Sequence, residues 1–249
     1  MFKDKLKEYV ETSGLVNMEE AGEGIDVLKY KKKVFYDNLW NDFVAECRGT
    51  IVDKDFNVVS RPFTKIYNYG IEKEAPVLAD DVEVTAYRKV NGFMIAMTVH
   101  NNELLISTTG STANDYVDMA KEMMETHMPL EDWLMTLGTA DSLGTTFMFE
   151  CVHPNDPHIV VEKPGMYFLG WRENSWESKV HGYGMLMAGV WEDFAKNMLN
   201  CHAVEYFNTT VGELVKLSKE VKHEGFVFYT EDGVSAKIKS PYYLTSKWV

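Results

Sequence analysis

The sequence has few cysteines, no long apolar run and too few basic residues to balance its acidic ones. Its 249 residues include three cysteines, Cys47, Cys151 and Cys201, and none belongs to a Cys-x-x-Cys pair. This pattern argues against a disulfide scaffold and a structural zinc site, and is typical of a reduced, cytoplasmic protein. No apolar run approaches the roughly 20 residues of a membrane-spanning helix. Residues 1–10 are charged and amphipathic, unlike the apolar core of a signal peptide. We therefore expect a cytoplasmic protein that does not engage membranes.

Acidic residues outnumber basic ones by 38 to 25, which gives a formal net charge of −13. A general nucleic-acid-binding surface needs Lys and Arg to contact phosphates, so the overall charge argues against one. The basic residues are nevertheless grouped. The groups are residues 29–33, Arg48, Arg61 with Lys65, Arg88 with Lys89, and residues 237–247. This distribution is compatible with a basic cleft in an acidic protein.

Several common catalytic and binding signatures are also absent. There is no Gly-x-x-x-x-Gly-Lys phosphate-binding loop, and no Ser-His-Asp or Cys-His signature stands out. His153 and His158 flank a turn-rich loop, but no third ligand at a suitable spacing completes a metal site. P-loop nucleotide binding, triad hydrolysis and a histidine-based metal site are thus disfavoured.

The chain is rich enough in hydrophobic residues (45%) and aromatic residues (13%) to bury a sizeable core. Alternating or continuous apolar runs predict extended segments at 26–36, 47–53, 57–61, 82–87, 93–99, 103–108, 146–152, 166–171, 225–230 and 234–238. Helical spacing and capping signals predict helices at 3–12, 114–137 with a break at Pro129, 178–200 and 210–222, and a helical turn at 37–45. These elements predict one α+β domain, rich in antiparallel strands, with helices packed outside.

Lys89 lies between two alternating runs, at residues 82–87 and 93–99, and just ahead of the turn pair Asn91-Gly92. The pattern predicts a hairpin with Lys89 where the sheet folds back. Two interpretations follow. Lys89 is an exposed lysine beside a turn, or it faces a cleft as a nucleophile that forms a covalent intermediate.

Other charged residues also interrupt the β runs. Arg48, Glu150 and Glu224 each have a simple explanation as a charge at a strand edge or strand start. Lys237 and Lys239 alternate along a strand, which places both on the same face of the sheet, and an ordinary solvated face would explain them. Each residue taken alone therefore indicates no particular chemistry.

Taken in order, these features resemble the covalent nucleotidyltransferase superfamily of ligases and RNA capping enzymes. The four motifs are Lys-x-Asn-Gly at 89–92, Phe-x-Phe-Glu at 147–150, Glu-Gly-Phe-Val-Phe at 224–228 and Lys-x-Lys at 237–239. Flanking residues at 46–49, 61–68 and 237–243, together with Val227, look like the RNA ligase branch. The closest resemblance is to RNA ligases of the phage tRNA-repair type (the RNA ligase 1 family) and to the ligase domain of fungal tRNA ligases. It covers residues 46–243.

The resemblance implies a fold and a domain organisation. The expected fold is the α+β, antiparallel-sheet nucleotidyltransferase fold, which is ATP-grasp-like and shared by DNA ligases, RNA ligases and capping enzymes, with flanking helices. Residues 1–249 would form an adenylyltransferase domain, with residues 1–45 as a family-specific N-terminal segment. Because the sequence ends ten residues past Lys239, we expect no separate C-terminal domain for RNA specificity.

The resemblance also implies three catalytic lysines. Lys89 would attack the α-phosphorus of ATP and form lysyl-AMP, while Lys237 and Lys239 would stabilise charge on that phosphate. An attacking amine must be neutral, and an exposed lysine has a pKa of about 10.4. We therefore expect burial and neighbouring cations to lower the pKa of Lys89.

Other residues are expected to bind the nucleotide and a metal. The set implied for the nucleotide is Arg48, Lys65, Asn91, Gly92, Glu150, Phe168, Val227 and Tyr243. Arg48 and Lys65 would hold the ribose or the outer phosphates, and Glu150 would accept hydrogen bonds from ribose hydroxyls. Phe168 and Val227 would contact the base. Glu224 would bind Mg²⁺ or Mn²⁺, since magnesium takes few carboxylates and keeps waters.

The implied reaction transfers AMP from Lys89 to an RNA 5′-phosphate and then joins that end to a 3′-hydroxyl. The expected partners are ATP and such RNA ends, for example those of nicked tRNA, with the protein a monomer in the cytoplasm, or in the host cytoplasm if it is phage-encoded. The alternatives are a capping guanylyltransferase, a DNA ligase, or a nucleotide- or RNA-binding module without catalysis. One departure bears on the last alternative, because Thr109 stands where the phage ligases commonly have a basic residue.

Overall fold

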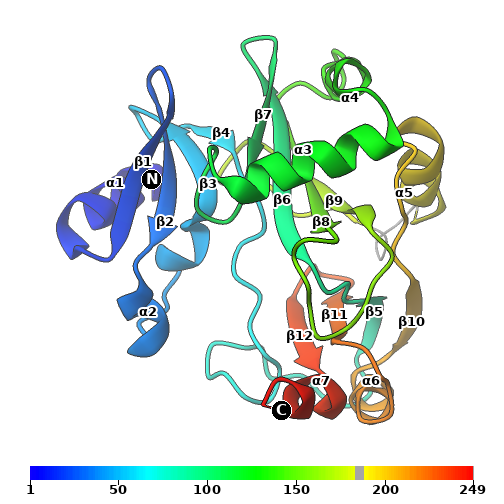
Figure 1. The fold of residues 1–249 in the computed structure, drawn as a ribbon. Coiled ribbons are helices and arrows are strands. Elements are labelled where there is room, and N and C mark those ends of the chain that lie inside the picture. Colours follow the sequence, from blue (N-terminus) through cyan, green and yellow to red (C-terminus); the bar gives the residue numbers. More distant parts are fainter. Residues whose placement is uncertain (183–187, 249) are drawn as a thin grey trace. The chain divides into compact units, whose positions relative to one another are not determined.

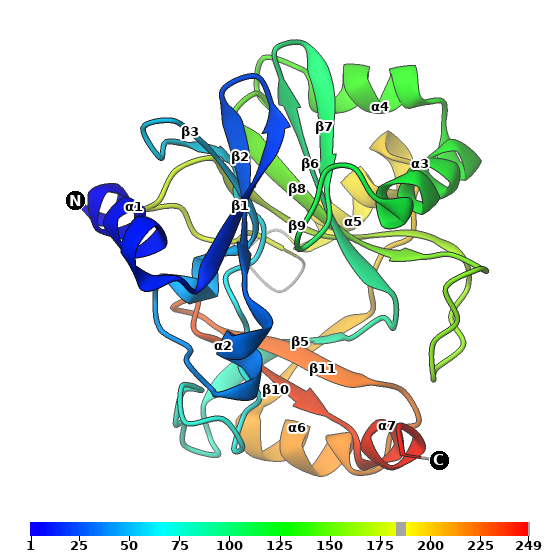
Figure 2. The ribbon, with the colours of Figure 1, turned by 60° about the vertical axis from the view of Figure 1, so that its left-hand side comes forward.

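The computed structural model describes residues 1–182 and 188–248. By their contacts the residues form two compact units (Figures 1 and 2). The first unit consists of Met1–Lys65, Met94–Phe149 and Trp171–Val180, and the second of Ile66–Phe93, Glu150–Gly170 and His181–Val249. The expected single adenylyltransferase domain, with residues 1–45 as a separate segment, stays a prediction.

The first unit begins with a helix packed on an antiparallel sheet. The sheet has the order β1-β2-β3-β4, from β1 (Val16–Gly22), β2 (Ile25–Tyr30), β3 (Arg48–Asp53) and β4 (Val58–Ser60). Helix α1 (Phe2–Ser13) ends at Gly14, whose φ of 70° is left-handed, as predicted from the glycine. Its apolar residues Leu6 and Val10 are buried with Leu28 of β2 and Val52 of β3, so an amphipathic face decides where this helix docks.

Two further helices of the first unit form where the sequence predicts one broken helix. They are α3 (Asp115–His127) and α4 (Leu130–Leu137), and Figure 1 shows α3 lying across β6 and β7. The Asn114 side chain caps α3 by accepting a hydrogen bond from Val117 N. Met123 and Met124 of α3 are buried and pack in the core, whereas Tyr116 is 43% exposed and lies outside it.

The second unit contains the sheet β10-β5-β11-β12. Its strands are β5 (Glu83–Arg88), β10 (Tyr206–Thr210), β11 (Gly225–Thr230) and β12 (Ser235–Lys239). Helices α6 (Val211–Ser218) and α7 (Pro241–Ser246) lie beside this sheet in Figure 2. Val211 and Leu214 of α6 are buried with Phe226 and Phe228 of β11. The Thr210 side chain accepts a hydrogen bond from Glu213 N, so the predicted cap of α6 is confirmed.

A third sheet has the order β7-β6-β8-β9. Its strands are β6 (Phe93–His100), β7 (Glu103–Ser107), β8 (Thr145–Val152) and β9 (Gly165–Glu173). The predicted hairpin around Lys89 is therefore wrong, because β5 and β6 belong to different sheets. The Asn91-Gly92 pair is a connection between sheets and not a two-residue turn.

Other elements also differ from the sequence predictions. Residues 32–36 form the short helix α2 (Lys32–Tyr36) instead of continuing a strand, and the helical turn expected at 37–45 is a 3₁₀ turn at Val44–Glu46. Strands β1 and β10 and helix α7 were not predicted. Helix α6 stops at Ser218 and not near residue 222.

The helix predicted at 178–200 forms only in its second part. It comprises α5 (Ala188–Asp193) and a π-helical turn at Phe194–Met198, and residues 178–182 are not helical. Residues 183–187 of that prediction, including Gly184, lie outside the described residues.

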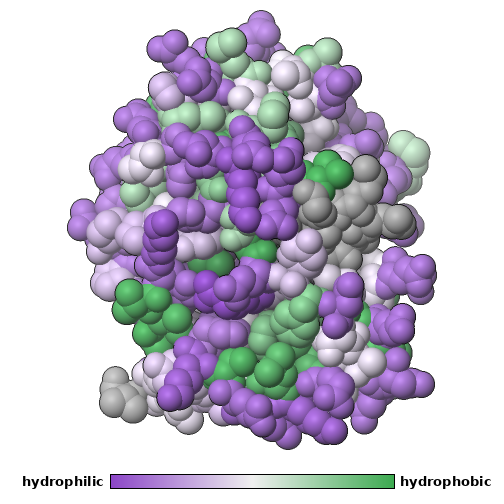
Figure 3. All heavy atoms as spheres, turned by 90° about the vertical axis from the view of Figure 1, so that its right-hand side faces the viewer, coloured by the Kyte–Doolittle hydropathy of each residue, from purple (hydrophilic) through white to green (hydrophobic). Residues whose placement is uncertain are grey.

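The face of the molecule drawn in Figure 3 is largely hydrophilic, and hydrophobic side chains form smaller groups on it. Across residues 1–182 and 188–248, no helix is both long and apolar enough to cross a membrane.

Candidate active site

Lys89 directly follows β5 in the second unit, and its amine contacts a buried carboxylate. The Lys89 N–H donates to Gly225 O at 2.9 Å, which extends the pairing of β5 with β11 by one residue. Lys89 Nζ lies 3.1 Å from Glu224 Oε1, and the two side chains are 24% and 8% exposed. The nucleophile and the metal ligand expected from the sequence are therefore ion-paired.

Gly225 allows the backbone to bring Glu224 and Lys89 together. It pairs with Lys239 of β12 at a φ of 136°, a conformation that favours glycine. A Cβ atom at this position would overlap the carbonyl oxygen of Ile238. The Glu-Gly pair thus reflects a close approach of β11 and β12 at the strand start that carries Glu224.

The lysines of β12 occupy the predicted common face of the sheet. Lys237 pairs with Val227, and Val227 pairs with Tyr87 on its other side. Register partners in an antiparallel sheet share a face. The core of the sheet lies on the opposite face, where Phe226 and Ala236 are buried. Val227 and Lys237 are thus on the face away from that core, and Lys239 shares it by alternation.

Glu150 joins the same charged group. Burial raises its pKa from 4.5 to about 7, Lys89 opposes that rise, and Glu224 adds to it. The Gly92 N–H donates a hydrogen bond to the Glu150 carboxylate. A Cβ at Gly92 would overlap the Cys151 carbonyl oxygen, so glycine permits this contact.

The electrostatics of Lys89 differ from the expectation. Burial lowers the pKa of Lys89, but the charges of Glu224 and Glu150 raise it by more, so the net shift is upward. The prediction of a lowered pKa was wrong because the sequence did not reveal that two carboxylates face the amine. For Lys239 the balance is reversed: burial and the charges of Lys89 and Lys247 outweigh Glu224, and its pKa falls.

Tyr243 and Ser240 connect β12 to the charged group. Lys239 Nζ lies 5.7 Å from the centre of the Tyr243 ring. Ser240 is fully buried; its N–H donates to Glu224 O at 2.8 Å, and its hydroxyl donates to His223 O. The same hydroxyl accepts from Tyr243 N at 3.1 Å and caps α7. Ser240 therefore holds Glu224, Lys239 and Tyr243 in one local structure.

Two other predicted nucleotide residues are buried. Phe168 is fully buried, with its ring 5.4 Å from that of Phe194, so it is a core residue and its predicted contact with the base is not supported. Asn91 is 3% exposed, and in the described parts of the chain its Nδ2 has no hydrogen-bond partner.

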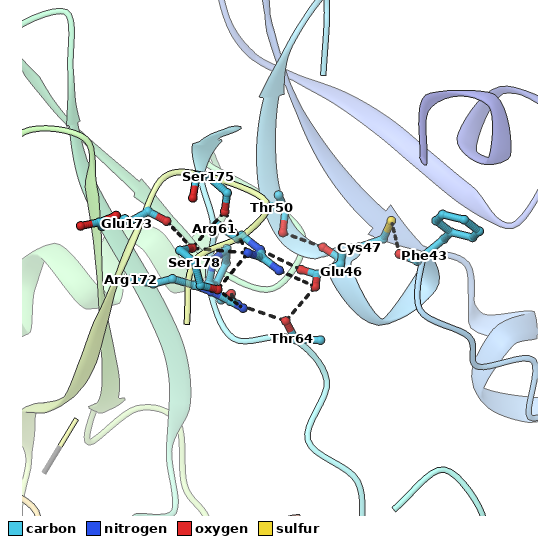
Figure 4. Close-up of polar contacts among 11 residues, drawn as sticks. Phe43, Glu46, Cys47, Thr50, Arg61, Thr64, Arg172, Glu173, Ser175 and Ser178 are labelled. Carbon is cyan, nitrogen blue, oxygen red and sulfur yellow. Dashed lines mark hydrogen bonds and ion pairs between the residues drawn. The ribbon is translucent and has the colours of Figure 1, made fainter. Parts of the chain in front are cut away.

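Arg48 and Lys65 belong to the first unit, where a buried network holds their backbone segments (Figure 4). Arg61 donates from Nη2 to Glu46 Oε1 at 2.8 Å and from Nε to Glu46 Oε2 at 3.1 Å. Thr64 Oγ1 donates to the same carboxylate at 2.9 Å. Glu46 thus connects the chain just before Arg48 to the chain just before Lys65.

The side chain of Lys65 is itself positioned by an aromatic ring. Its Nζ lies 4.2 Å from the centre of the Trp40 ring, and its N–H donates to Ala45 O at 2.9 Å. Arg48 pairs in register with Lys29 of β2. Both Arg48 and Lys65 are therefore positioned by contacts within the first unit.

A cation also lies next to Thr109. A Cβ added at Gly110 would be 3.0 Å from Lys29 Nζ. Lys29 is exposed, and no described carboxylate lies within ion-pair distance of it. Although position 109 lacks a basic residue, Lys29 therefore provides a positive charge beside this turn.

Sequence reasoning missed two residues beside Lys89. Arg88 donates from Nη1 and Nη2 to the two oxygens of Glu162, each at 2.8 Å. The position of Arg88, a charged residue at the end of the apolar strand β5, could have indicated that it belongs to the site. Glu162 follows the apolar residues 159–161 in an irregular loop, and no predicted strand marked it as a site residue.

The described residues contain no group of three or more His, Cys, Asp or Glu side chains arranged to hold a metal. Glu224 is the carboxylate in contact with the Lys89 amine.

Comparison with known proteins identifies the family. The sequence model of the RNA ligase family matches residues 46–243. The chain belongs to the RNA ligase family. All four motifs quoted above fall within the matched range.

Solved structures of ligases share the fold of this RNA ligase family member. A protein from Aquifex aeolicus assigned as an ATP-dependent DNA ligase matches 96% of the chain with a TM-score of 0.61 and 16% identity. An archaeal ATP-dependent RNA ligase matches 95% with a TM-score of 0.59 and 14% identity. A variant of the Naegleria gruberi RNA ligase solved with ATP and Mn matches 67% of this chain and 52% of its own, with a TM-score of 0.50 and 13% identity.

These similarities confirm the predicted α+β, antiparallel nucleotidyltransferase fold. The chain spans 63% of the Aquifex protein and 61% of the archaeal ligase.

Proposed function

We propose that this member of the RNA ligase family is an ATP-dependent RNA ligase in which Lys89 becomes covalently adenylylated. The observation that carries the proposal is the contact of Lys89 Nζ with Glu224, beside Glu150 and Lys239. A lysine kept only for solubility would not be buried against two carboxylates. The motif order and the family match support the same conclusion.

In the first step the neutral Lys89 amine would attack the α-phosphorus of ATP. A P–N bond forms, the P–O bond to pyrophosphate breaks, and the amine loses a proton. Lys239, whose pKa is lowered by burial, and Lys237 would stabilise charge on the α-phosphate.

The proton on Lys89 must leave before attack. Its raised pKa means that Glu224 and Glu150 hold the amine in the charged form in the unliganded protein. Glu224 would hold a divalent cation, Mg²⁺ or Mn²⁺, which supplies positive charge beside the amine and opposes its protonation. The Naegleria gruberi RNA ligase variant solved with ATP and Mn supports the use of a divalent cation.

The remaining residues would bind the nucleotide. Glu150 would accept from ribose hydroxyls, and Val227, on the face of the sheet away from its core, would contact the base together with Tyr243. The Arg48 guanidinium and the Lys65 amine would bind outer phosphates. Asn91 would direct its buried, unpartnered Nδ2 to the ligand, and Gly92 keeps Glu150 in place.

The second and third steps rest on the family. AMP would pass from Lys89 to an RNA 5′-phosphate, and a 3′-hydroxyl would then displace AMP and join the strands. RNA repair, with nicked tRNA as one substrate, is the proposed role, and the protein would act as a monomer with ATP and Mg²⁺.

The test is covalent labelling with α-labelled ATP or GTP and Mg²⁺. ATP is expected to label the wild-type protein, Lys89→Ala is expected to abolish the label, and the exposed-site control Lys216→Ala is expected to keep it. Glu224→Ala and Lys239→Ala should reduce labelling strongly. Labelling of Lys89→Ala would overturn the proposal.

Chase experiments separate the alternatives. A label transferred to 5′-phosphorylated RNA supports an RNA ligase, and transfer only to nicked DNA would indicate a DNA ligase. Labelling by GTP in place of ATP would indicate a capping guanylyltransferase. ATP binding without any covalent label would indicate a binding module.

A further inference from the structure

Arg88 and Glu162 form a two-point ion pair next to Lys89. Both distances are 2.8 Å, from Arg88 Nη1 and Nη2 to the two carboxylate oxygens. The Glu162 side chain is 5% exposed and that of Arg88 is 21% exposed. Parallel hydrogen bonds of this kind fix direction as well as distance, because the guanidinium is planar. The pair is therefore a rigid connection rather than a surface contact.

Glu162 also reaches the chain on the other side of Lys89. Its Oε1 lies 3.5 Å from the Asn91 backbone nitrogen, which donates to it. One carboxylate thus contacts the residue before Lys89 and the residue two positions after it. The Lys89 N–H itself is held by Gly225 O. These contacts leave residues 88–91 little freedom at the junction between two sheets.

This restraint is needed because ordinary secondary structure stops here. Strand β5 ends at Arg88, and β6 begins at Phe93 in another sheet. A lysine in a loose loop would have to be ordered in each reaction cycle. A displacement of the reacting group by about 1 Å can lower the rate about 100-fold. A buried carboxylate that spans the loop removes that freedom beforehand.

The ion pair does not replace the reacting groups. In the part of the chain that the structure describes, Lys89 Nζ is ion-paired with Glu224 and makes no contact with Glu162. Arg88 is further accompanied by Glu205, whose carboxylate is 3.8 Å from Arg88 Nε but 84% exposed. Glu205 is therefore a matched comparison: its carboxylate lies near the same guanidinium without burial, two-point geometry or contact with Asn91, and its backbone carbonyl, which accepts from Arg88 N at 2.9 Å, is unchanged by substitution.

We propose that Glu162 is a positioning residue for lysyl-AMP formation, which acts with Arg88 to hold residues 88–91 so that the Lys89 amine meets the α-phosphate. The proposal rests on the proposed adenylylation of Lys89. It predicts that the pair affects the rate of covalent bond formation and not the binding of ATP.

The experiment measures single-turnover adenylylation rates at several ATP concentrations for Glu162→Gln, Arg88→Lys and the double variant. Each single variant is expected to lose about 10- to 100-fold in maximal rate, with the ATP concentration at half-maximal rate within about twofold of wild type. The double variant should lose no more than the worse single variant, because both remove the same two-point contact. Glu205→Gln should stay within about twofold of wild type.

Melting temperatures measured on the same samples show whether Glu162→Gln is folded. If it folds poorly, Arg88→Lys decides the test, because it keeps the positive charge. Adenylylation rates equal to wild type in the variants would overturn the inference. A double variant whose loss in rate is the product of the two single losses would also overturn it, as would a loss confined to ATP affinity. Absence of labelling in the wild-type protein would instead overturn the proposed function itself.

Discussion

Replacing Glu150 by Gln should make the protein more stable at neutral pH while removing the proposed acceptor for the ribose hydroxyls. Burial raises the pKa of Glu150 from 4.5 to about 7. Below pH 4.5 the carboxyl is protonated in both folded and unfolded chains and contributes no difference. Between pH 4.5 and about pH 7 the unfolded chain releases its proton before the folded chain does. The free energy of unfolding therefore falls until the pH passes the folded-state pKa. Glutamine resembles the protonated form at every pH.

The size of the effect follows from the pKa difference. A change from 4.5 to about 7 is 2.5 units, and at about 1.36 kcal/mol per unit it corresponds to about 3 kcal/mol. For a chain of this length that is a rise in melting temperature of about 6–12 °C. Glu150→Gln and wild type should therefore melt alike near pH 4.5 and diverge by this amount at pH 8.

The assay is thermal unfolding of both proteins in matched buffers between pH 4.5 and pH 8. Glu231→Gln, in the exposed turn after β11, is the control and should show no such divergence. A difference that is the same at pH 5 and pH 8 would refute the reasoning, because it would show that the Glu150 charge carries no desolvation cost. In the labelling assay the same substitution should reduce adenylylation, since the proposed ribose acceptor is lost.

Three further substitutions test the supporting structure. Gly225→Ala should destabilise the protein by about 2–5 kcal/mol, because its Cβ would overlap Ile238 O at a φ of 136°; urea unfolding within about 0.5 kcal/mol of wild type would contradict this. Arg61→Met should cost about 3–5 kcal/mol, since it leaves the Glu46 carboxylate buried without its cation, and a smaller loss in urea would show that water reaches that carboxylate. Ser240→Ala should remove the cap of α7 at about 1 kcal/mol and slow adenylylation; an unchanged labelling rate would show that this serine does not position the site.

The sequence alone determined the local features that depend on neighbouring residues. Alternation placed Lys237 and Lys239 on one face of β12, and the Thr210 capping box marked the start of α6. The order of the charged motifs was sufficient to predict the family to which the chain belongs, while Lys89 as the reacting residue stays a prediction. The alternation and the cap each involve residues only a few positions apart, so periodicity and capping chemistry express them directly, and each charged motif is itself a short run of neighbouring residues.

Tertiary structure decided what depends on residues far apart in the chain. The strand pairing around Lys89 could not be predicted from the sequence. Asn-Gly favours a tight turn between paired strands, but β5 pairs with β10 and β11. The pKa of Lys89 changes direction because Glu224 and Glu150 converge on it from distant strands. Glu162 meets Arg88 across a separation of 74 positions. Coulombic and hydrogen-bond energies depend on distance in space, which a sequence pattern does not record.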